Sequence, residues 1–282
     1  MGKLDGKVAI ITGAARGQGR SHALTLAREG AEIVAVDIAH DMKTLQYSLG
    51  TPEQLRETVA GVEALDRRAL GIEADVRSQE AMDDVVERAI AEFGKVDILV
   101  ANHGVWGLTP FWEITDDHWN EMIDTNLGGA WRITKAVTPH MIERQQGSIV
   151  MIGSVNALEP ATDYAHYCAA KAGVEMLARN VALELGRFGV RCNCVCPSAT
   201  DTPIIKWQGA LDRFVSEGAS VEDLNDAMRY FTGLKGRRLL NPQSMSNAVL
   251  FLVSDDAADI TGVTLPVDGG HMVLTGHNHN PG

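Results

Sequence analysis

The sequence lacks an excess of basic residues and any long apolar run. Its 282 residues include 25 Lys and Arg against 37 Asp and Glu, a net charge of −12. Nucleic acids and anionic membranes both reward clustered basic side chains, so this balance disfavours both as partners. No apolar run approaches the roughly 18 residues that span a bilayer. The first residues lead into an expected strand without a long apolar leader, so we expect a cytoplasmic protein.

Cysteine is scarce, and three of the four lie together in the stretch CNCVC. Zinc sites more often pair two C-x2-C units, whereas alternation at period two places all three side chains on one face of a short strand. We therefore predict a buried apolar strand and no metal site at Cys192, Cys194 and Cys196. The uneven spacing of the GHNHNPG tail likewise favours a terminus, crossing onto a neighbouring subunit, over a metal site formed by His271, His277 and His279.

Apolar, β-rich runs alternate along the chain with segments of helical periodicity. This alternation predicts the α/β class: a Rossmann-like, doubly wound parallel sheet with helices on both faces, built as a single domain over residues 1–282. Ligands bind such sheets outside the carboxyl ends of the strands. The expected strands are Val8–Thr12, Glu32–Val36, Ala69–Glu73, Ile98–Ala101, Ser148–Ile152, Val190–Val195 and Thr264–Val267. The expected helices are Gly17–Glu29, Pro52–Leu65, Gln79–Phe93, Asp116–Arg144, Tyr164–Arg187 and Pro242–Val253.

Two regions depart from this regular alternation. Residues 38–50 form a thirteen-residue insertion where a strand-to-helix loop usually has about 2–6 residues. The insertion ends at a helix start marked by a capping box, Thr51 with Gln54, and by Pro52. Residues 198–238 are polar and mixed, and we expect them to form a substrate-binding excursion with two short helices, around Ala210–Ser216 and Val221–Thr232.

The stretch TGAARGQG, residues 12–19, follows the first expected strand and opens the first helix. Glycines there permit a tight turn and let a pyrophosphate approach backbone N–H groups at a helix N-terminus. Because the stretch joins a strand to a helix, it predicts a dinucleotide site. The residues expected to contact the cofactor are Gly13, Arg16, Gly17, Gln18 and Gly19.

The residue at the end of the second strand, Asp37, indicates which dinucleotide binds. A carboxylate at this place accepts hydrogen bonds from both ribose hydroxyls of NAD and repels the 2′-phosphate of NADP. Arg16 acts in the opposite direction, since a guanidinium near the adenosine favours that phosphate. We expect Asp37 to prevail because it meets the ribose directly and is followed by apolar Ile38 instead of a second base. The predicted cofactor is NAD.

Further cofactor contacts are expected where the third and fourth strands end. In the stretch ADV, we expect Asp75 near the adenine amino group and Val76 against the adenine ring. The stretch ANHG, residues 101–104, lies at the edge of the crevice and contributes Asn102, His103 and Gly104.

The stretch YCAAK places Tyr167 and Lys171 at positions i and i+4, on one face of a helix. An unperturbed tyrosine has a pKa of about 10, and a neighbouring ammonium lowers that pKa by stabilising the phenolate. Ser154, thirteen residues earlier and just past a strand, can hydrogen-bond the same substrate oxygen. Tyrosine and lysine four residues apart are often a surface pair, but beside Ser154 and a dinucleotide site they predict a catalytic group.

Jointly these motifs, with Asn126 in DTNLGGAW and the closing VDGG, resemble the short-chain dehydrogenase/reductase family over essentially the whole chain. The resemblance implies that Ser154, Tyr167 and Lys171 form the catalytic core. It implies that Asn126 holds a helix kink and a water of a proton relay behind Lys171. It also implies that Lys171 binds the nicotinamide ribose, while Tyr167 exchanges the hydroxyl proton as hydride moves between substrate and nicotinamide.

The chain departs from the family pattern at two places. The usual Asn-Asn-Ala-Gly is Ala-Asn-His-Gly at residues 101–104, which keeps the second Asn and the Gly under the ribose. The usual Pro-Gly after the sixth strand is Pro-Ser. The residues expected there to address the nicotinamide amide and the pyrophosphate are Pro197, Thr200 and Thr202.

Aromatic residues make up only 5% of the chain, and several fall near the expected mouth of the sheet or in the excursion. They favour an apolar, cyclic alcohol or ketone as substrate. For Phe111 and Trp112, core or subunit contacts are as well supported as a place in the substrate pocket. The residues assigned to the substrate are Trp106, Ser154, Tyr164, Tyr167 and Trp207.

The insertion at residues 38–50 resembles one branch of the family, the mycofactocin-associated, carveol dehydrogenase-like enzymes. In that branch the insertion folds over the adenosine end of NAD, and the cofactor is held so tightly that an external, mycofactocin-like redox carrier recycles it. Such a cover slows release, because release then depends on loop opening. The family resemblance also implies a homotetramer.

The sequence thus predicts an NAD-dependent oxidoreductase that interconverts a hydrophobic secondary alcohol, such as the cyclic terpenoid carveol, and its ketone. A freely exchanging 3-oxoacyl reductase is an alternative, although it would favour NADPH, which Asp37 opposes. A non-catalytic NAD-binding redox sensor is a second alternative. The intact catalytic set opposes it, namely Asn126, Ser154, Tyr167 and Lys171.

Overall fold

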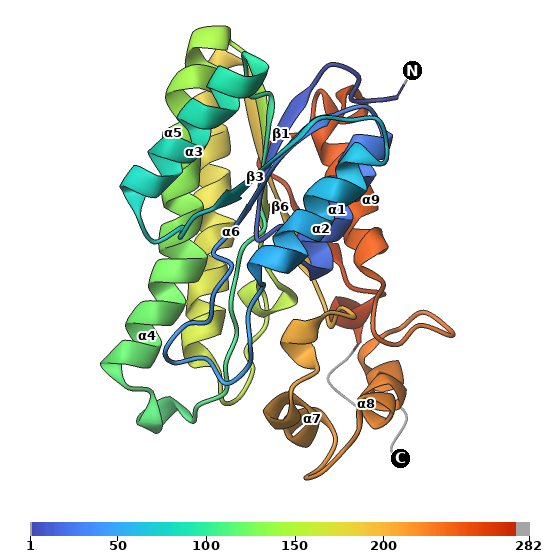
Figure 1. Ribbon diagram of the computed structural model, residues 1–282. Helices are drawn as coiled ribbons and strands as arrows, with labels where there is room; N and C mark the ends of the chain where they lie inside the picture. Colours follow the sequence, from blue (N-terminus) through green and yellow to red (C-terminus); the bar gives the residue numbers. More distant parts are fainter. Residues whose placement is uncertain (1, 275–282) are drawn as a thin grey trace.

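Seven parallel strands form one sheet in the order β3-β2-β1-β4-β5-β6-β7, in a computed structural model that describes residues 2–274 (Figure 1). The strands are β1 Val8–Thr12, β2 Glu32–Asp37, β3 Ala69–Glu73, β4 Ile98–Ala101, β5 Gly147–Ile152, β6 Val190–Pro197 and β7 Thr264–Val267. The helices are α1 Gly17–Arg28, α2 Pro52–Glu63, α3 Gln79–Phe93, α4 Asp116–Ile123, α5 Gly129–Arg144, α6 Ala165–Leu185, α7 Gln208–Phe214, α8 Val221–Ala227 and α9 Pro242–Val253. The order reverses between β1 and β4, which is where doubly wound sheets bind ligands. The predicted fold class is confirmed.

Helices cover both faces of the sheet, with α1, α2 and α9 on one face and α3, α5 and α6 on the other (Figure 1). Strands buried on both faces need near-continuous apolar runs, and all five residues of β1 are buried. The three clustered cysteines, Cys192, Cys194 and Cys196, are fully buried on the face covered by α3, α5 and α6. Their predicted role as small apolar strand residues is confirmed.

One predicted helix is interrupted. The sequence predicted a single helix over Asp116–Arg144, but a π-helical turn at Asp124–Gly128 separates α4 from α5. Asn126 in this turn is buried, and its Nδ2 donates to the Met122 carbonyl four residues earlier (3.0 Å). The side chain thereby takes the place of a backbone donor at that carbonyl, which favours a bulge there. This is the kink that the family pattern implied at Asn126.

The excursion at residues 198–238 lies beyond the carboxyl ends of the strands, at the bottom of Figure 1. Its two helices, α7 and α8, contribute to a small apolar cluster of their own through Leu211 and Leu224. Both helices end earlier than predicted, at Phe214 and Ala227, and α8 continues into a 3-10 turn. The excursion therefore forms a cap over the ligand side of the sheet.

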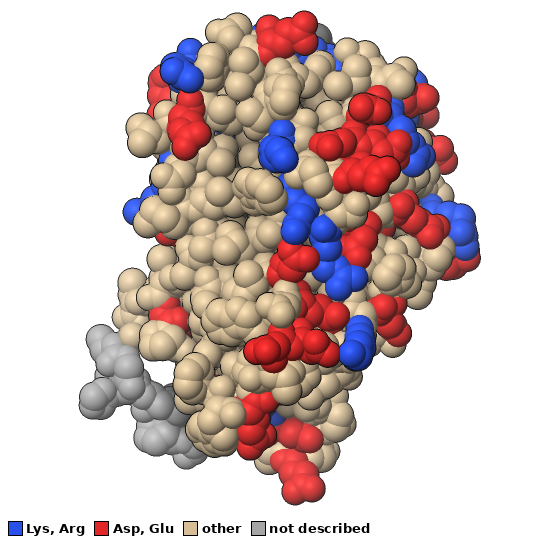
Figure 2. Space-filling view, turned by 90° about the vertical axis from the view of Figure 1, so that its left-hand side faces the viewer, with Lys and Arg blue, Asp and Glu red and all other residues tan. Residues whose placement is uncertain are grey.

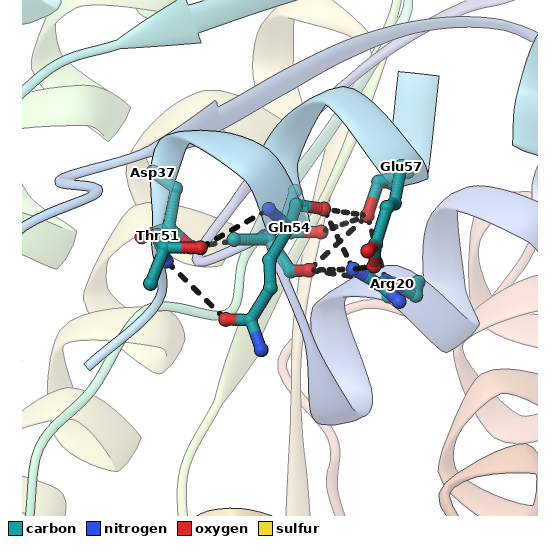
Figure 3. Close-up of polar contacts among 8 residues, drawn as sticks. Arg20, Asp37, Thr51, Gln54 and Glu57 are labelled. Carbon is teal, nitrogen blue, oxygen red and sulfur yellow. Dashed lines mark hydrogen bonds and ion pairs between the residues drawn. The ribbon is translucent and has the colours of Figure 1, made fainter. Parts of the chain in front are cut away.

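The insertion at residues 38–50 contains no helix or strand, and the predicted capping box follows it (Figure 3). Thr51 Oγ accepts from the Gln54 N–H, and Gln54 Oε1 accepts from the Thr51 N–H. Arg20 of α1 donates to the Gln54 carbonyl (2.6 Å) and to the Ala15 carbonyl in the glycine turn (2.7 Å). Arg20 thus fixes the start of α2, and with it the end of the insertion, against the glycine turn.

The described surface carries mixed charge. In Figure 2, Asp and Glu side chains lie in clusters beside Lys and Arg, and broad uncharged areas separate them. No helix within residues 2–274 is long and apolar enough to cross a membrane. Helices α4 to α6 expose several large apolar side chains: Trp119, Trp131, Met176 and Leu183.

Candidate active site

A cleft runs along the carboxyl ends of the strands in two adjoining halves, which share Gln18, Asn102, Gly104, Thr202 and Ile204. The first half, called here the cofactor half, is lined by the predicted residues Gly13, Arg16, Gly17, Gln18, Gly19, Asp37, Ile38, Asp75, Val76, Asn102, His103, Gly104 and Thr202. The second, the substrate half, is lined by the predicted residues Trp106, Ser154, Tyr164, Tyr167, Lys171, Pro197 and Thr200.

The glycine turn lies at the floor of the cofactor half. Gly13 and Gly17 have φ values of +67° and +56°, which side chains rarely adopt. A Cβ at Gly19 would collide with the Gly13 carbonyl. Asn102 Nδ2 donates to the Gly13 carbonyl (3.2 Å) and so ties the end of β4 to the turn. Because Arg16 makes no side-chain cap bond, the first N–H groups of α1 are available to an anion.

Asp37 is buried at the end of β2 and faces the cofactor half. Its Oδ2 accepts from the Ala15 N–H (2.9 Å) and its Oδ1 from the Ala39 N–H (3.1 Å). A carboxylate offers about four acceptor positions, so capacity remains for a ribose diol. Arg16 instead donates to the Ser48 carbonyl of the insertion, and burial lowers the pKa of Arg16. The guanidinium that favoured a 2′-phosphate is therefore engaged elsewhere.

A dinucleotide fits the chemistry of this half. Two buried polar atoms of residues that line it have no hydrogen-bond partner within residues 2–274: Gln18 Oε1 and Thr125 Oγ. His103 Nδ1 lies 2.6 Å from Thr12 Oγ, and burial lowers the pKa of His103 to about 3. The imidazole is thus neutral, and its Nε2 lies beside Gly129 of α5. Buried polar groups are normally paired, so these atoms indicate a ligand with polar groups of its own.

The predicted adenine contact, Asp75, already has a partner. Arg77 donates to it through Nε and Nη2 (2.9 and 2.7 Å to Oδ2). Burial raises the pKa of Asp75, but the Arg77 bonds outweigh this and leave the pKa lowered. Arg77 also pairs with Glu121 of α4 (3.6 Å), which accepts from the Thr44 N–H of the insertion (3.0 Å). One polar network therefore connects the adenine side of the cleft to the insertion.

The predicted catalytic residues meet at the junction of the two halves. Ser154 follows β5, while Tyr167 and Lys171 share one face of α6. Lys171 Nζ donates to the Ile152 carbonyl (2.8 Å) and lies 5.7 Å from the centroid of the Tyr167 ring. A Cβ at Gly104 would lie 2.8 Å from Asn126 Oδ1 and 3.2 Å from Lys171 Nζ, so both groups border the same small space. This geometry suits the relay that the family pattern implied.

Burial dominates the electrostatics of this catalytic group. It lowers the pKa of Lys171 to about 8. Burial also raises the pKa of Tyr167, and the hydrogen bond with the Ser154 side chain opposes that rise without cancelling it. The expectation that Lys171 brings the Tyr167 pKa toward neutrality is therefore not met by the chain alone. When bound, NAD⁺ supplies a positively charged nicotinamide ring, which favours the phenolate and accepts the hydride.

Aromatic side chains form the far wall of the substrate half. Trp106 and Tyr164 are buried there in an edge-to-face pair, with ring centroids 5.4 Å apart. Trp207, which the sequence assigned to the substrate, lies against Trp106 with ring centroids 6.0 Å apart. It is not among the side chains that line the cavity. Phe111 and Trp112 are 71% and 80% exposed, so in this chain they belong neither to the core nor to the cleft.

Sequence reasoning missed several residues of the cleft. Tyr47 lines the cofactor half and its hydroxyl accepts from the Trp106 N–H (3.1 Å), although nothing in the insertion indicated where its tyrosine would lie. Thr125 had one signal, since it directly precedes Asn126. His271 was placed in a terminal segment, but it lines the substrate half with Glu159. His277 and His279 lie outside the described residues.

Comparisons with known proteins agree with this geometry. The family model for short chain dehydrogenases matches residues 7–210. The chain belongs to the short-chain dehydrogenase family. It is 42% identical over 275 residues to the (-)-trans-carveol dehydrogenase of Rhodococcus erythropolis, covering 96% of this chain and 99% of that protein.

Two crystal structures are similar over nearly the whole chain. Carveol dehydrogenase from Mycobacterium avium, in complex with NAD, has a TM-score of 0.94 at 40% identity, covering 97% of this chain and 100% of that one. A short chain dehydrogenase from Mycobacterium paratuberculosis, bound to NAD, has a TM-score of 0.87 at 36% identity with the same coverage. With the Asp37 geometry, they confirm the prediction of an NAD-dependent dehydrogenase.

Proposed function

We propose that this dehydrogenase oxidises hydrophobic, cyclic secondary alcohols of the carveol type to ketones, and that its NAD does not exchange freely. Tyr167 takes the hydroxyl proton, Ser154 holds the reacting oxygen, and Lys171 with Asn126 passes the proton onward. Bound NAD would accept the hydride. The largely apolar wall around Trp106 and Tyr164, together with the carveol dehydrogenases among the relatives, supports this substrate class.

The observation that carries the proposed retention is the path of the insertion at residues 38–50. Met42, Tyr47 and Leu49 line the cofactor half, and Met42 and Leu49 are buried. The insertion is bonded to the glycine turn through Arg16 and Ser48, and to the substrate wall through Tyr47 and Trp106. NAD in this cleft would lie under a cover held in place at Tyr47 and Ser48, so its release would require the cover to open. An external redox carrier of the mycofactocin type would then reoxidise the cofactor in place.

Two measurements on freshly purified protein test this proposal. Denaturation should release about one nicotinamide dinucleotide per chain, and carveol should be oxidised with an artificial electron acceptor but slowly with added NAD. Absence of bound nicotinamide, or free turnover of added NAD, would overturn retention while leaving the dehydrogenase activity intact. Failure to oxidise any cyclic secondary alcohol would overturn the substrate class.

The two alternatives make different predictions. A 3-oxoacyl reductase would reduce acyl thioesters with NADPH, which the buried Asp37 carboxylate opposes. A non-catalytic redox sensor would bind NAD without turnover, and replacement of Tyr167 by Phe would then change nothing measurable. We expect Tyr167→Phe to lower alcohol oxidation by at least about a hundredfold while NAD stays bound, because it removes the proton acceptor.

We propose a homotetramer assembled through the face of α4 to α6. Trp119, Trp131, Met176 and Leu183 are between 41% and 82% exposed there, which is unfavourable for large apolar side chains unless a second copy covers them. Light scattering of the purified protein measures the assembly, and a monomer at micromolar concentration would contradict it.

A further inference from the structure

The lining of the substrate half contains one carboxylate and one imidazole, those of Glu159 and His271. Glu159 follows the short 3-10 turn after Ser154, and His271 follows β7, so segments 112 residues apart meet in one wall. Neither side chain has a part in the proton and hydride transfers described above.

The His271 ring is fixed on three sides. It stacks on Phe231 with centroids 5.6 Å apart and planes 9° apart, and Nδ1 lies 3.0 Å from the Phe231 carbonyl oxygen. A carbonyl oxygen only accepts, so Nδ1 donates. Nε2 lies 2.6 Å from Glu159 Oε1, and that contact also needs a proton between the two atoms. The two contacts therefore hold the imidazole between the Phe231 carbonyl and the Glu159 carboxylate.

Glu159 keeps one oxygen for another partner. Its Oε1 meets His271, while no donor among residues 2–274 is hydrogen-bonded to Oε2. The side chain is 33% exposed, and it borders a cavity that is also lined by Trp106 and Phe214. A carboxylate oxygen accepts hydrogen bonds and cannot donate them. A ligand that satisfies it must present a hydroxyl or an N–H.

We propose that Glu159, positioned by His271, binds a second hydroxyl of the substrate, so that the preferred substrates are diols or hydroxy ketones with one hydroxyl distal to the reacting carbon. This inference rests on the proposed dehydrogenase function and narrows its substrate class. Ser154 and Tyr167 hold the reacting oxygen, and the distal hydroxyl donates to Glu159 Oε2. A hydrogen bond to a carboxylate is stronger than one between neutral groups, so it selects between alcohols that differ in this hydroxyl.

The test compares two alcohols of the same skeleton: para-isopropylcyclohexanol, and the same compound with a hydroxyl on the isopropyl carbon. For the protein as purified, we expect kcat/KM to favour the hydroxylated alcohol by at least about tenfold. Glu159→Met, similar in length but apolar, should bring this ratio close to one. His271→Phe, which keeps the stack on Phe231, should lower it several-fold. The control Glu184→Met, at an exposed position on α6, should leave it unchanged.

The ratio of the two kcat/KM values distinguishes binding of the distal hydroxyl from a purely structural role. If the contact between Glu159 and His271 only joined two segments of the chain, its loss would lower kcat/KM for both alcohols together. A wild-type ratio near one overturns the inference, and this result needs no variant to fold. A tenfold ratio that survives in both Glu159→Met and His271→Phe overturns it as well. If neither alcohol is oxidised, both the proposed function and this inference are wrong. If both alcohols are oxidised with equal kcat/KM, only this inference is wrong.

Discussion

The hydroxyl of Tyr47 accepts a hydrogen bond from the backbone N–H of Trp106, and its ring stacks on Trp207. Tyr47 belongs to the insertion that begins beside Asp37 at the adenosine end of the cleft. Trp106 belongs to the wall of the substrate half, next to the catalytic residues. The insertion therefore runs the length of the cofactor half instead of covering only the adenosine end.

This contact makes Tyr47 the point at which cofactor release is most easily changed. Burial raises the pKa of Tyr47 to about 12, so the phenol stays neutral and acts as an acceptor for Trp106. Tyr47→Phe keeps the ring stack and removes that acceptor. We expect NAD to dissociate about two- to tenfold faster, as loss of one neutral hydrogen bond allows. Loss of bound nicotinamide during dialysis measures the rate.

The matched control is Tyr230→Phe, which removes a tyrosine hydroxyl bonded only to the neighbouring Arg229 among the described residues. It should leave the dissociation rate unchanged. Equal rates in wild type and Tyr47→Phe would show that the insertion is held by its other contacts, and that Tyr47 does not limit release.

Asp37 is expected to decide between the two dinucleotides. Asp37→Asn keeps an acceptor oxygen and removes the charge, so we expect the Kd for NAD to rise at least about tenfold. The variant should not bind NADP tightly in place of NAD, because the Arg16 guanidinium donates to the Ser48 carbonyl and is not available to a 2′-phosphate. Titration of cofactor-free protein with each dinucleotide measures both affinities, and the exposed Asp83→Asn on α3 is the control. Tight NADP binding by Asp37→Asn would show that Arg16 can leave Ser48.

Local spacing explains why the sequence could predict that the proposed catalytic residues come together. Tyr167 and Lys171 share a helix face through a separation of four residues, and Asp37 and Ser154 each lie at or just past the end of a strand. In a parallel sheet all carboxyl ends meet at one edge, so residues at these ends come together whatever the detailed packing. Only the pKa of Tyr167 escaped this reasoning, since burial depends on the tertiary surroundings.

The contacts of irregular segments could not be predicted in this way. The insertion has no periodicity to give its side chains a direction, so the meeting of Tyr47 with Trp106 follows only from the folded chain. Glu159 and His271 come together across 112 residues of sequence, with no motif linking them. The exposure of the Trp112 side chain could not be predicted for the same reason. The surroundings of a side chain in an irregular segment are set by residues that are distant in sequence.

The buried ammonium of Lys171 gives a prediction for stability. Burial lowers the pKa of Lys171 from 10.5 to about 8, so between these pH values the unfolded chain holds a proton that the folded chain has lost. The free energy of unfolding contributed by Lys171 should therefore rise with pH across this window, by about 3 kcal/mol at most. Denaturant unfolding of cofactor-free wild type minus Lys171→Met isolates this contribution from other groups. A difference that stays flat between pH 8 and 10.5 would mean that Lys171 keeps its proton in the fold.

Gly50, the last residue of the insertion, packs closely against Asp37. A Cβ added there would lie 2.9 Å from Asp37 Oδ1 and 2.9 Å from the Ala15 Cβ, although the backbone φ needs no glycine. Gly50→Ala should therefore displace the insertion or the carboxylate, destabilising the fold by about 1–3 kcal/mol and weakening NAD binding. Gly186→Ala, where a Cβ would meet nothing within 4 Å, is the matched control and should be close to neutral. Thermal unfolding with and without NAD measures both effects, and a Gly50→Ala protein that retains NAD as wild type does would show that the end of the insertion can yield without disturbing Asp37.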